Sequence, residues 1–72
     1  MKYIIETEGL HCGHCDASVE SALLKVAGVT GADSDHEAQT VEVEADGNIS
    51  EDALKAAVES AGDFRALSVT AA

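Results

Sequence analysis

The chain has 72 residues, of which 14 are acidic and four are basic, giving a formal net charge of −10. A chain of this length buries only about 60% of the surface that its unfolded form exposes, which leaves no room for a deep substrate cleft between domains. The negative charge disfavours binding to nucleic acids and to anionic membranes, because no basic patch offsets it. We therefore expect one small domain over residues 1–72.

Residues 2–8 alternate in polarity, a pattern typical of a half-buried strand. Tyr3, Ile5 and Thr7 share one face of that strand, and Gly9 ends it. The same N-terminal stretch has one basic residue and no long apolar run, so it resembles neither a signal peptide nor a membrane span. We therefore expect a cytosolic protein, in a reducing compartment where a structural disulfide is disfavoured.

From about residue 15 to residue 26 the apolar period changes to that of a helix. The apolar stripe consists of Val19, Ala22, Leu23 and Val26. Asp16 and Glu20 stand near the start of this helix, where its dipole favours acidic side chains, and Gly28 is suited to end it.

The remaining segments predict two further strands, a second helix and a last strand. Residues 29–35 form a weak strand candidate because small and acidic residues dominate them, whereas residues 39–45 alternate clearly. Between them we expect a turn that places His36 on the surface. Ser50 is suited to cap a helix that Gly62 ends, with Ile49 and Leu54 as a hydrophobic staple, and residues 65–70 alternate again.

The predicted order is therefore βαββαβ, an α+β fold. Such a split βαβ arrangement folds as a ferredoxin-like domain, a four-stranded antiparallel sheet with both helices on one face. Right-handed crossovers place the loop after the first strand and the loop after the second helix at the same end.

The residues that carry chemistry are Cys12-Gly13-His14-Cys15, between the first strand and the first helix. The positive end of the helix dipole favours a thiolate, which is both a metal ligand and a nucleophile. Two thiolates suit a soft cation of low coordination number such as Cu(I), whereas structural Zn(II) normally takes four ligands. The sequence has no second cysteine pair, although it has histidines at positions 11, 14 and 36.

A thiol–disulfide oxidoreductase is the alternative from a different functional class, because a CxxC near a βαβ pattern can be redox-active. The chain is shorter than the thioredoxin fold requires, no Trp precedes the motif, and no proline exists to face the thiols. These features favour a binding protein over an enzyme.

The segment Gly9-Leu10-His11-Cys12-Gly13-His14-Cys15 resembles the Gly-Met-x-Cys-x-x-Cys signature of heavy-metal-associated domains, and especially small bacterial copper chaperones of the CopZ type. The resemblance spans nearly the whole chain, through Val19-Glu20-x-Ala22-Leu23 and Gly28-Val29 in the first half. In the second half it continues through Leu54-x-x-Ala57-Val58-Glu59-x-Ala61-Gly62.

The resemblance implies that Cys12 and Cys15 bind Cu(I) and pass it by ligand exchange to a related domain, typically on a P-type copper ATPase. A Cu-bridged homodimer is a further expectation for an exposed two-thiolate site. His11 and His14 are possible additional ligands. A Zn(II) or Hg(II) carrier of the same fold is the alternative, and a zinc carrier would need a further ligand such as His11 or Asp63.

Three departures from the family pattern are visible in the sequence. Leu10 replaces the usual Met and is expected to pack beneath the loop. Ala32 and Ser34 stand where bulky apolar residues are usual, which predicts a thin second strand. Asp63 separates Gly62 from Phe64, where an aromatic residue often follows the glycine directly.

Overall fold

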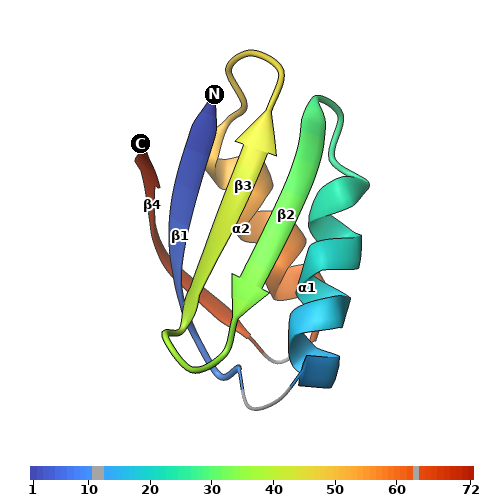
Figure 1. The fold of residues 1–72 in the computed structure, drawn as a ribbon, viewed down its shortest axis with the longest axis vertical. Coiled ribbons are helices and arrows are strands. Elements are labelled where there is room, and N and C mark those ends of the chain that lie inside the picture. Colours follow the sequence, from blue (N-terminus) through green and yellow to red (C-terminus); the bar gives the residue numbers. More distant parts are fainter. Residues whose placement is uncertain (11–12, 63) are drawn as a thin grey trace.

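The computed structural model describes residues 1–10, 13–62 and 64–72. Its elements follow the predicted βαββαβ order (Figure 1). They are β1 (Lys2–Glu8), α1 (Gly13–Leu24), β2 (Val29–Asp35), β3 (Thr40–Ala45), α2 (Glu51–Ser60) and β4 (Arg65–Ala71). None of the helices in the described part of the chain is long and apolar enough to cross a membrane.

The four strands form one antiparallel sheet in the order β2-β3-β1-β4, and both helices lie on the same face of it (Figure 1). This arrangement confirms the ferredoxin-like fold that the element order predicts. β2 and β4 are the edge strands, so the most deeply placed strands are β1 and β3.

The core lies between the sheet and the two helices. As the alternation of β1 predicts, Tyr3, Ile5 and Thr7 are buried, while Glu6 and Glu8 are exposed. The buried hydrophobic residues are Tyr3, Ile5, Leu10, Val19, Leu23, Val41, Val43, Ala45, Leu54 and Val58. Most of them are branched aliphatic side chains, which pack closely between small helices and a sheet.

Helix α1 begins two residues before the predicted start and ends two residues before the predicted end. The first turn of a helix needs no apolar periodicity, so the stripe could not locate Gly13 as its start. After Leu24, the amides of Lys25 and Val26 donate to carbonyls three residues back. These bonds tighten the last turn and end the regular helix, although Val26 continues the apolar spacing.

Helix α2 begins after Ser50, as predicted, but the Ser50 side chain makes no capping hydrogen bond. The Ser50 carbonyl instead accepts the amide of Leu54, at 3.2 Å. The chain entering α2 is also held by Ile49, whose amide donates to the Tyr3 hydroxyl at 3.1 Å. This tertiary contact fixes the start of the helix without a side-chain cap.

Strand β2 forms over the full predicted range despite its poor β propensity. It pairs with β3 from Val29 to Asp35, with one irregularity between Val29 and Gly31. The end of the sheet at which β2 leads into β3 is also the end at which β1 leads toward α1 and α2 leads toward β4 (Figure 1). Chain segments distant in sequence therefore meet at the end of the sheet where α1 begins (Figure 1).

Candidate metal centre

The cysteine segment, residues 9–15, leads from β1 into the first turn of α1. Gly9 has a φ of 101°, a left-handed conformation that glycine adopts without the steric cost of a Cβ. Leu10 is only 3% exposed and belongs to the core, as predicted for the residue beneath the loop. The chain is therefore held by the buried side chain of Leu10 directly after Gly9.

Cys15 is the third residue of α1 and is half-buried, packed against the core. His14, beside it, is exposed to solvent. Cys12, His11 and Asp63, the other residues with predicted metal-binding roles, lie outside the described residues. Within residues 1–10, 13–62 and 64–72, no three His, Cys, Asp or Glu side chains are grouped so that they could hold a metal ion.

Phe64 packs against the core close to the end of α2. A Cβ built on Gly62 would lie 2.8 Å from Phe64 Cε2, so glycine at this position lets the ring approach the backbone. The sequence predicted Leu10 and Phe64 as packing residues, and the structure places both in or against the core.

A polar network joins the first turns of α1 to β2 and to the turn after it. The Ser34 hydroxyl donates to Asp16 Oδ1 at 2.8 Å, and His36 Nδ1 lies 2.6 Å from Asp16 Oδ2. The Ser34 amide donates to Glu20 Oε2 at 2.9 Å. Ser34 is only 7% exposed, so a polar side chain here replaces apolar packing with hydrogen bonds to α1.

This network shifts the pKa values of its two titratable members. Burial raises the pKa of Asp16, but hydrogen bonds from His36 and Ser34 and the charge of His36 outweigh it, so the pKa lies below its usual value. The hydrogen bond to Asp16 raises the pKa of His36 against an opposing effect of desolvation, and the charges of Asp16, Glu37 and Asp35 raise it further. The His36–Asp16 pair is therefore favoured in its charged form.

The sequence predicted a surface position for His36; its side chain is 33% exposed, and its pairing with Asp16 was not predicted. Asp16 and Glu20 were predicted only to complement the helix dipole, yet both bind β2 or the residues after it. Their partners are between 14 and 20 residues away in sequence, so no local spacing indicates the pairing. The one available signal was Ser34, a small polar residue where an apolar one is usual.

Gln39, which follows the turn, is the residue that sequence reasoning missed. Its Oε1 accepts the Leu10 amide at 3.2 Å, and its Nε2 donates to the Leu10 carbonyl at 2.7 Å and to the His36 carbonyl. Its own carbonyl accepts the amide of Thr7 at 2.8 Å. The turn is thus bound to the chain just before the cysteines.

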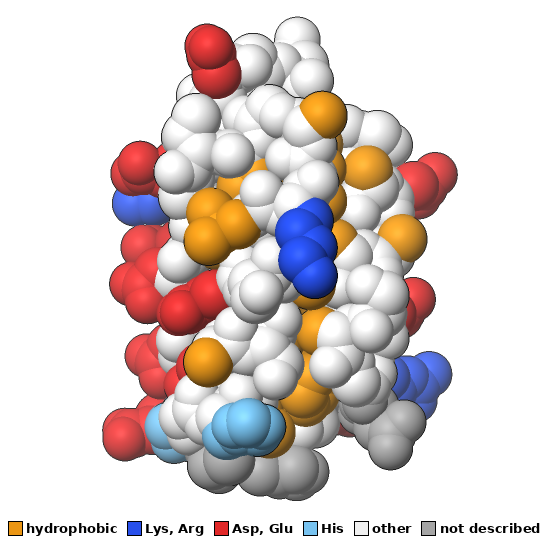
Figure 2. Space-filling view, turned by 90° about the vertical axis from the view of Figure 1, so that its right-hand side faces the viewer, with side chains coloured by type: hydrophobic (Ala, Val, Ile, Leu, Met, Phe, Trp, Pro, Cys, Tyr) orange, Lys and Arg blue, Asp and Glu red, His pale blue; other side chains and the backbone are white. Residues whose placement is uncertain are grey.

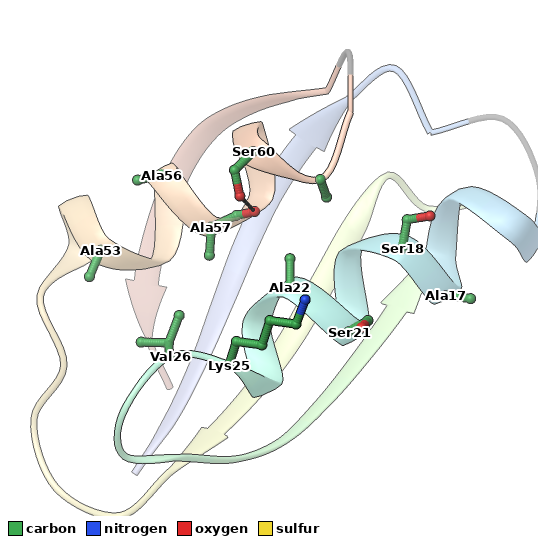
Figure 3. Close-up of a pocket in the computed structure, with 11 residues that line it drawn as sticks. Ala17, Ser18, Ser21, Ala22, Lys25, Val26, Ala53, Ala56, Ala57 and Ser60 are labelled. Atoms are coloured by element: carbon green, nitrogen blue, oxygen red, sulfur yellow. Dashed lines mark hydrogen bonds between the residues drawn. The ribbon is translucent and has the colours of Figure 1, made fainter.

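An open groove runs between α1 and α2 (Figure 3), lined mostly by alanine and serine side chains. Lys25 is its one cationic lining residue among the described residues. Ala17 and Ser18, at one end of the groove, lie two and three residues after Cys15 along α1. Figure 2 shows hydrophobic side chains through the middle of the face over α1, with acidic side chains gathered along one edge.

The acidic edge belongs to the face of the sheet opposite the helices. Cross-strand partners share a face of a sheet, and Asp33 pairs with Glu42, Ile4 with Glu42, and Lys2 with Glu44. The exposed acidic residues on the strands are Glu6, Glu8, Asp33, Asp35, Glu42 and Glu44. Six acidic residues therefore lie on the sheet face opposite the helices.

Residues 4–63 match the profile of the heavy-metal-associated domain. The copper chaperone CopZ of Staphylococcus haemolyticus is 43% identical over 60 residues, which cover 82% of this chain and 88% of that protein. A CopZ metallochaperone structure superposes with a TM-score of 0.85 at 37% identity, covering 93% of this chain and all of that one. The N-terminal domain of a potential copper-translocating P-type ATPase from Bacillus subtilis, solved in its Cu(I)-loaded state, has a TM-score of 0.77 at 29% identity, covering 99% of this chain and 91% of that one.

Proposed function

The chain belongs to the heavy-metal-associated domain family, and we propose that it carries Cu(I) between the thiolates of Cys12 and Cys15. The observation that carries the proposal is the position of Cys15, half-buried in the first turn of α1, three residues after a second cysteine. The positive end of the α1 dipole stabilises anionic sulfur at this position. Copper is the cargo here, and the chain's role is to hold it and to release it.

The ligand chemistry favours Cu(I) over harder ions. Cu(I) is satisfied by two soft thiolates, whereas Zn(II) in a protein usually requires four ligands. His14 is exposed on α1, which supports a ligand set without it. The copper chaperones among the relatives argue for the same cargo.

We infer that delivery occurs by ligand exchange with a related domain on a P-type copper ATPase. A thiolate of the recipient forms a third Cu–S bond, after which the Cu–S bond to Cys12 or Cys15 breaks. A second recipient thiolate then replaces the remaining cysteine in the same way, with no change in the oxidation state of copper. The alanine and serine groove beside Cys15 presents few charges to such a partner. The thiols must stay reduced, so we place the domain, residues 1–72, in the cytosol.

The two alternatives make different demands on the chain. A Zn(II) carrier of this fold would draw on His11 or Asp63 as a further ligand, whereas a Hg(II) carrier would use the two thiolates. A thiol–disulfide oxidoreductase would cycle Cys12 and Cys15 with a disulfide substrate, but the relatives are chaperones and their family is not enzymatic. A second copy of the chain bridged by one copper ion is a further possible acceptor.

The direct test is an anaerobic titration of the reduced protein with Cu(I) in the presence of a competing chelator, repeated with Zn(II). Cu(I) binding with one equivalent per monomer, lost in the Cys12→Ser/Cys15→Ser double variant and kept in His14→Ala, supports the proposal. Retention of Cu(I) by the double variant, or preference for Zn(II), would contradict it. Transfer is tested by mixing the loaded protein with the Bacillus subtilis ATPase domain, which should take up copper.

A further inference from the structure

We propose that Gln39 is a positioning residue for the cysteine segment, and that the β2–β3 turn braces this segment on both sides of the cysteines. The inference deepens the proposed function and rests on it for its metal-binding consequence. The brace consists of residues 36–39, which contact Leu10 before the cysteines and Asp16 after them. Neither contact involves a side chain of the CxxC motif itself.

On the side before the cysteines, the Gln39 amide group pairs with both backbone groups of Leu10, as a neighbouring strand would. Its Oε1 accepts the Leu10 N–H and its Nε2 donates to the Leu10 carbonyl. The second Nε2 hydrogen goes to the His36 carbonyl within the turn. Both hydrogens of the Gln39 side-chain amide are donated, so only one orientation of this amide makes all three hydrogen bonds.

On the other side, His36 reaches Asp16, the residue directly after Cys15. Asp16 also accepts the Ser34 hydroxyl, which ties the same helical turn to the end of β2. The turn is therefore fixed to α1 independently of Gln39. Because the turn is bound to α1 in this way, the hydrogen bonds from Gln39 attach Leu10 to a part of the chain that is itself held in place.

The backbone conformation of Gln39 is energetically unfavourable for a residue other than glycine. Its φ of 56° is left-handed, and it is the one non-glycine residue with positive φ among the described residues. Such a conformation persists where the surroundings over-determine it. Here the Gln39 carbonyl accepts the Thr7 amide while its side chain binds Leu10, so backbone and side chain both hold the end of β1 and the residues that follow it.

One residue separates Leu10 from Cys12, the first cysteine ligand of the proposed site. A ligand that is held in its binding conformation before the metal arrives loses less conformational freedom on binding, which raises affinity. Removing the Gln39 side-chain contacts should therefore weaken Cu(I) binding about tenfold, equivalent to about 1.4 kcal/mol.

The test compares Gln39→Met with two controls. Methionine keeps the length of the side chain but can make none of the three amide hydrogen bonds. Ile49→Ala lowers stability at the opposite end of the sheet, near Gly28, without touching the brace. Ala38→Met places the same apolar side chain at an exposed position in the same turn.

Two readouts are measured on each protein: Cu(I) affinity by chelator competition, and hydrogen exchange of the Leu10 amide in the metal-free state. We expect about tenfold weaker Cu(I) binding and about tenfold faster Leu10 exchange in Gln39→Met alone. Unchanged affinity in Gln39→Met, or an equal loss in Ile49→Ala, would overturn the positioning role.

If the unmodified protein does not bind Cu(I), the proposed function fails, and the brace is judged by the Leu10 amide. Faster exchange confined to Gln39→Met then supports the brace, and unchanged exchange overturns it.

Discussion

The substitution Thr7→Val should stabilise the fold. Thr7 is 3% exposed, and its hydroxyl has no hydrogen-bond partner among the described residues. Valine has nearly the same shape and the same branching at Cβ, so it creates no cavity and keeps the preference for a strand. The backbone hydrogen bond from the Thr7 amide to the Gln39 carbonyl is unaffected. Removing a buried hydroxyl that pays its desolvation cost without a partner should add about 1–2 kcal/mol to the free energy of unfolding.

Urea denaturation followed by circular dichroism measures this change, with an unchanged m-value as evidence that the same surface is exposed. In a domain of this size the gain corresponds to about 4–8 °C in Tm for each kcal/mol. Thr70→Val is the matched control, because Thr70 is exposed on β4 and its substitution should stay within about 0.5 kcal/mol. A Thr7→Val variant that is less stable by about 1 kcal/mol would refute the reasoning, since it would mean that the hydroxyl makes a stabilising hydrogen bond.

Three other predictions concern stability. The raised pKa of His36 means that the His36–Asp16 pair stabilises the fold fully below the ordinary histidine value of 6.5, and that this contribution is lost as pH rises through the higher folded-state value. Urea unfolding at pH 5.5 and 8.5 should show this loss of stability, and the His36→Gln variant should lack that part of the pH dependence. An identical pH profile of stability in the variant would count against the prediction. The Asp33→Thr substitution should raise the free energy of unfolding by about 0.5–1 kcal/mol at low salt, because Asp33 lies directly opposite Glu42 on the adjacent strand. If the same gain in stability persisted in 1 M salt, charge repulsion would not be its cause. The Leu23→Ala substitution should lower the free energy of unfolding by about 2–5 kcal/mol, because the Leu23 side chain is completely buried between α1 and the sheet. A loss below about 1 kcal/mol in the same urea assay would contradict this core position.

Most of the fold could be predicted from the sequence because most of its helices and strands have a clear periodicity of their own. The alternation around Ile5 and Val43 and the helical spacing of Leu54 and Val58 are local patterns, and each pattern identifies the face that must be buried. Strand β2 was the weakest prediction, since Gly31 and its neighbours have little β propensity. It forms because β3 offers backbone partners along most of its length, a tertiary effect that overrides propensity.

The candidate site was predictable in its ligands but not in its support. Cys15 stands out by its spacing from Cys12, and soft-metal chemistry follows from the residue type. The bonds from Gln39 to Leu10 and from His36 to Asp16 join residues 29 and 20 positions apart, respectively. Glutamine, histidine and aspartate are common surface residues, so no local pattern distinguishes these three as structural.

The measurement that tests the central claim most directly is X-ray absorption spectroscopy of the protein loaded anaerobically with one equivalent of Cu(I). The account predicts a Cu(I) edge and a first shell of two sulfur atoms, supplied by Cys12 and Cys15, with no contribution from imidazole nitrogen. A first shell that includes nitrogen or oxygen, or one that persists in the Cys12→Ser/Cys15→Ser variant, would contradict a copper carrier based on two thiolates.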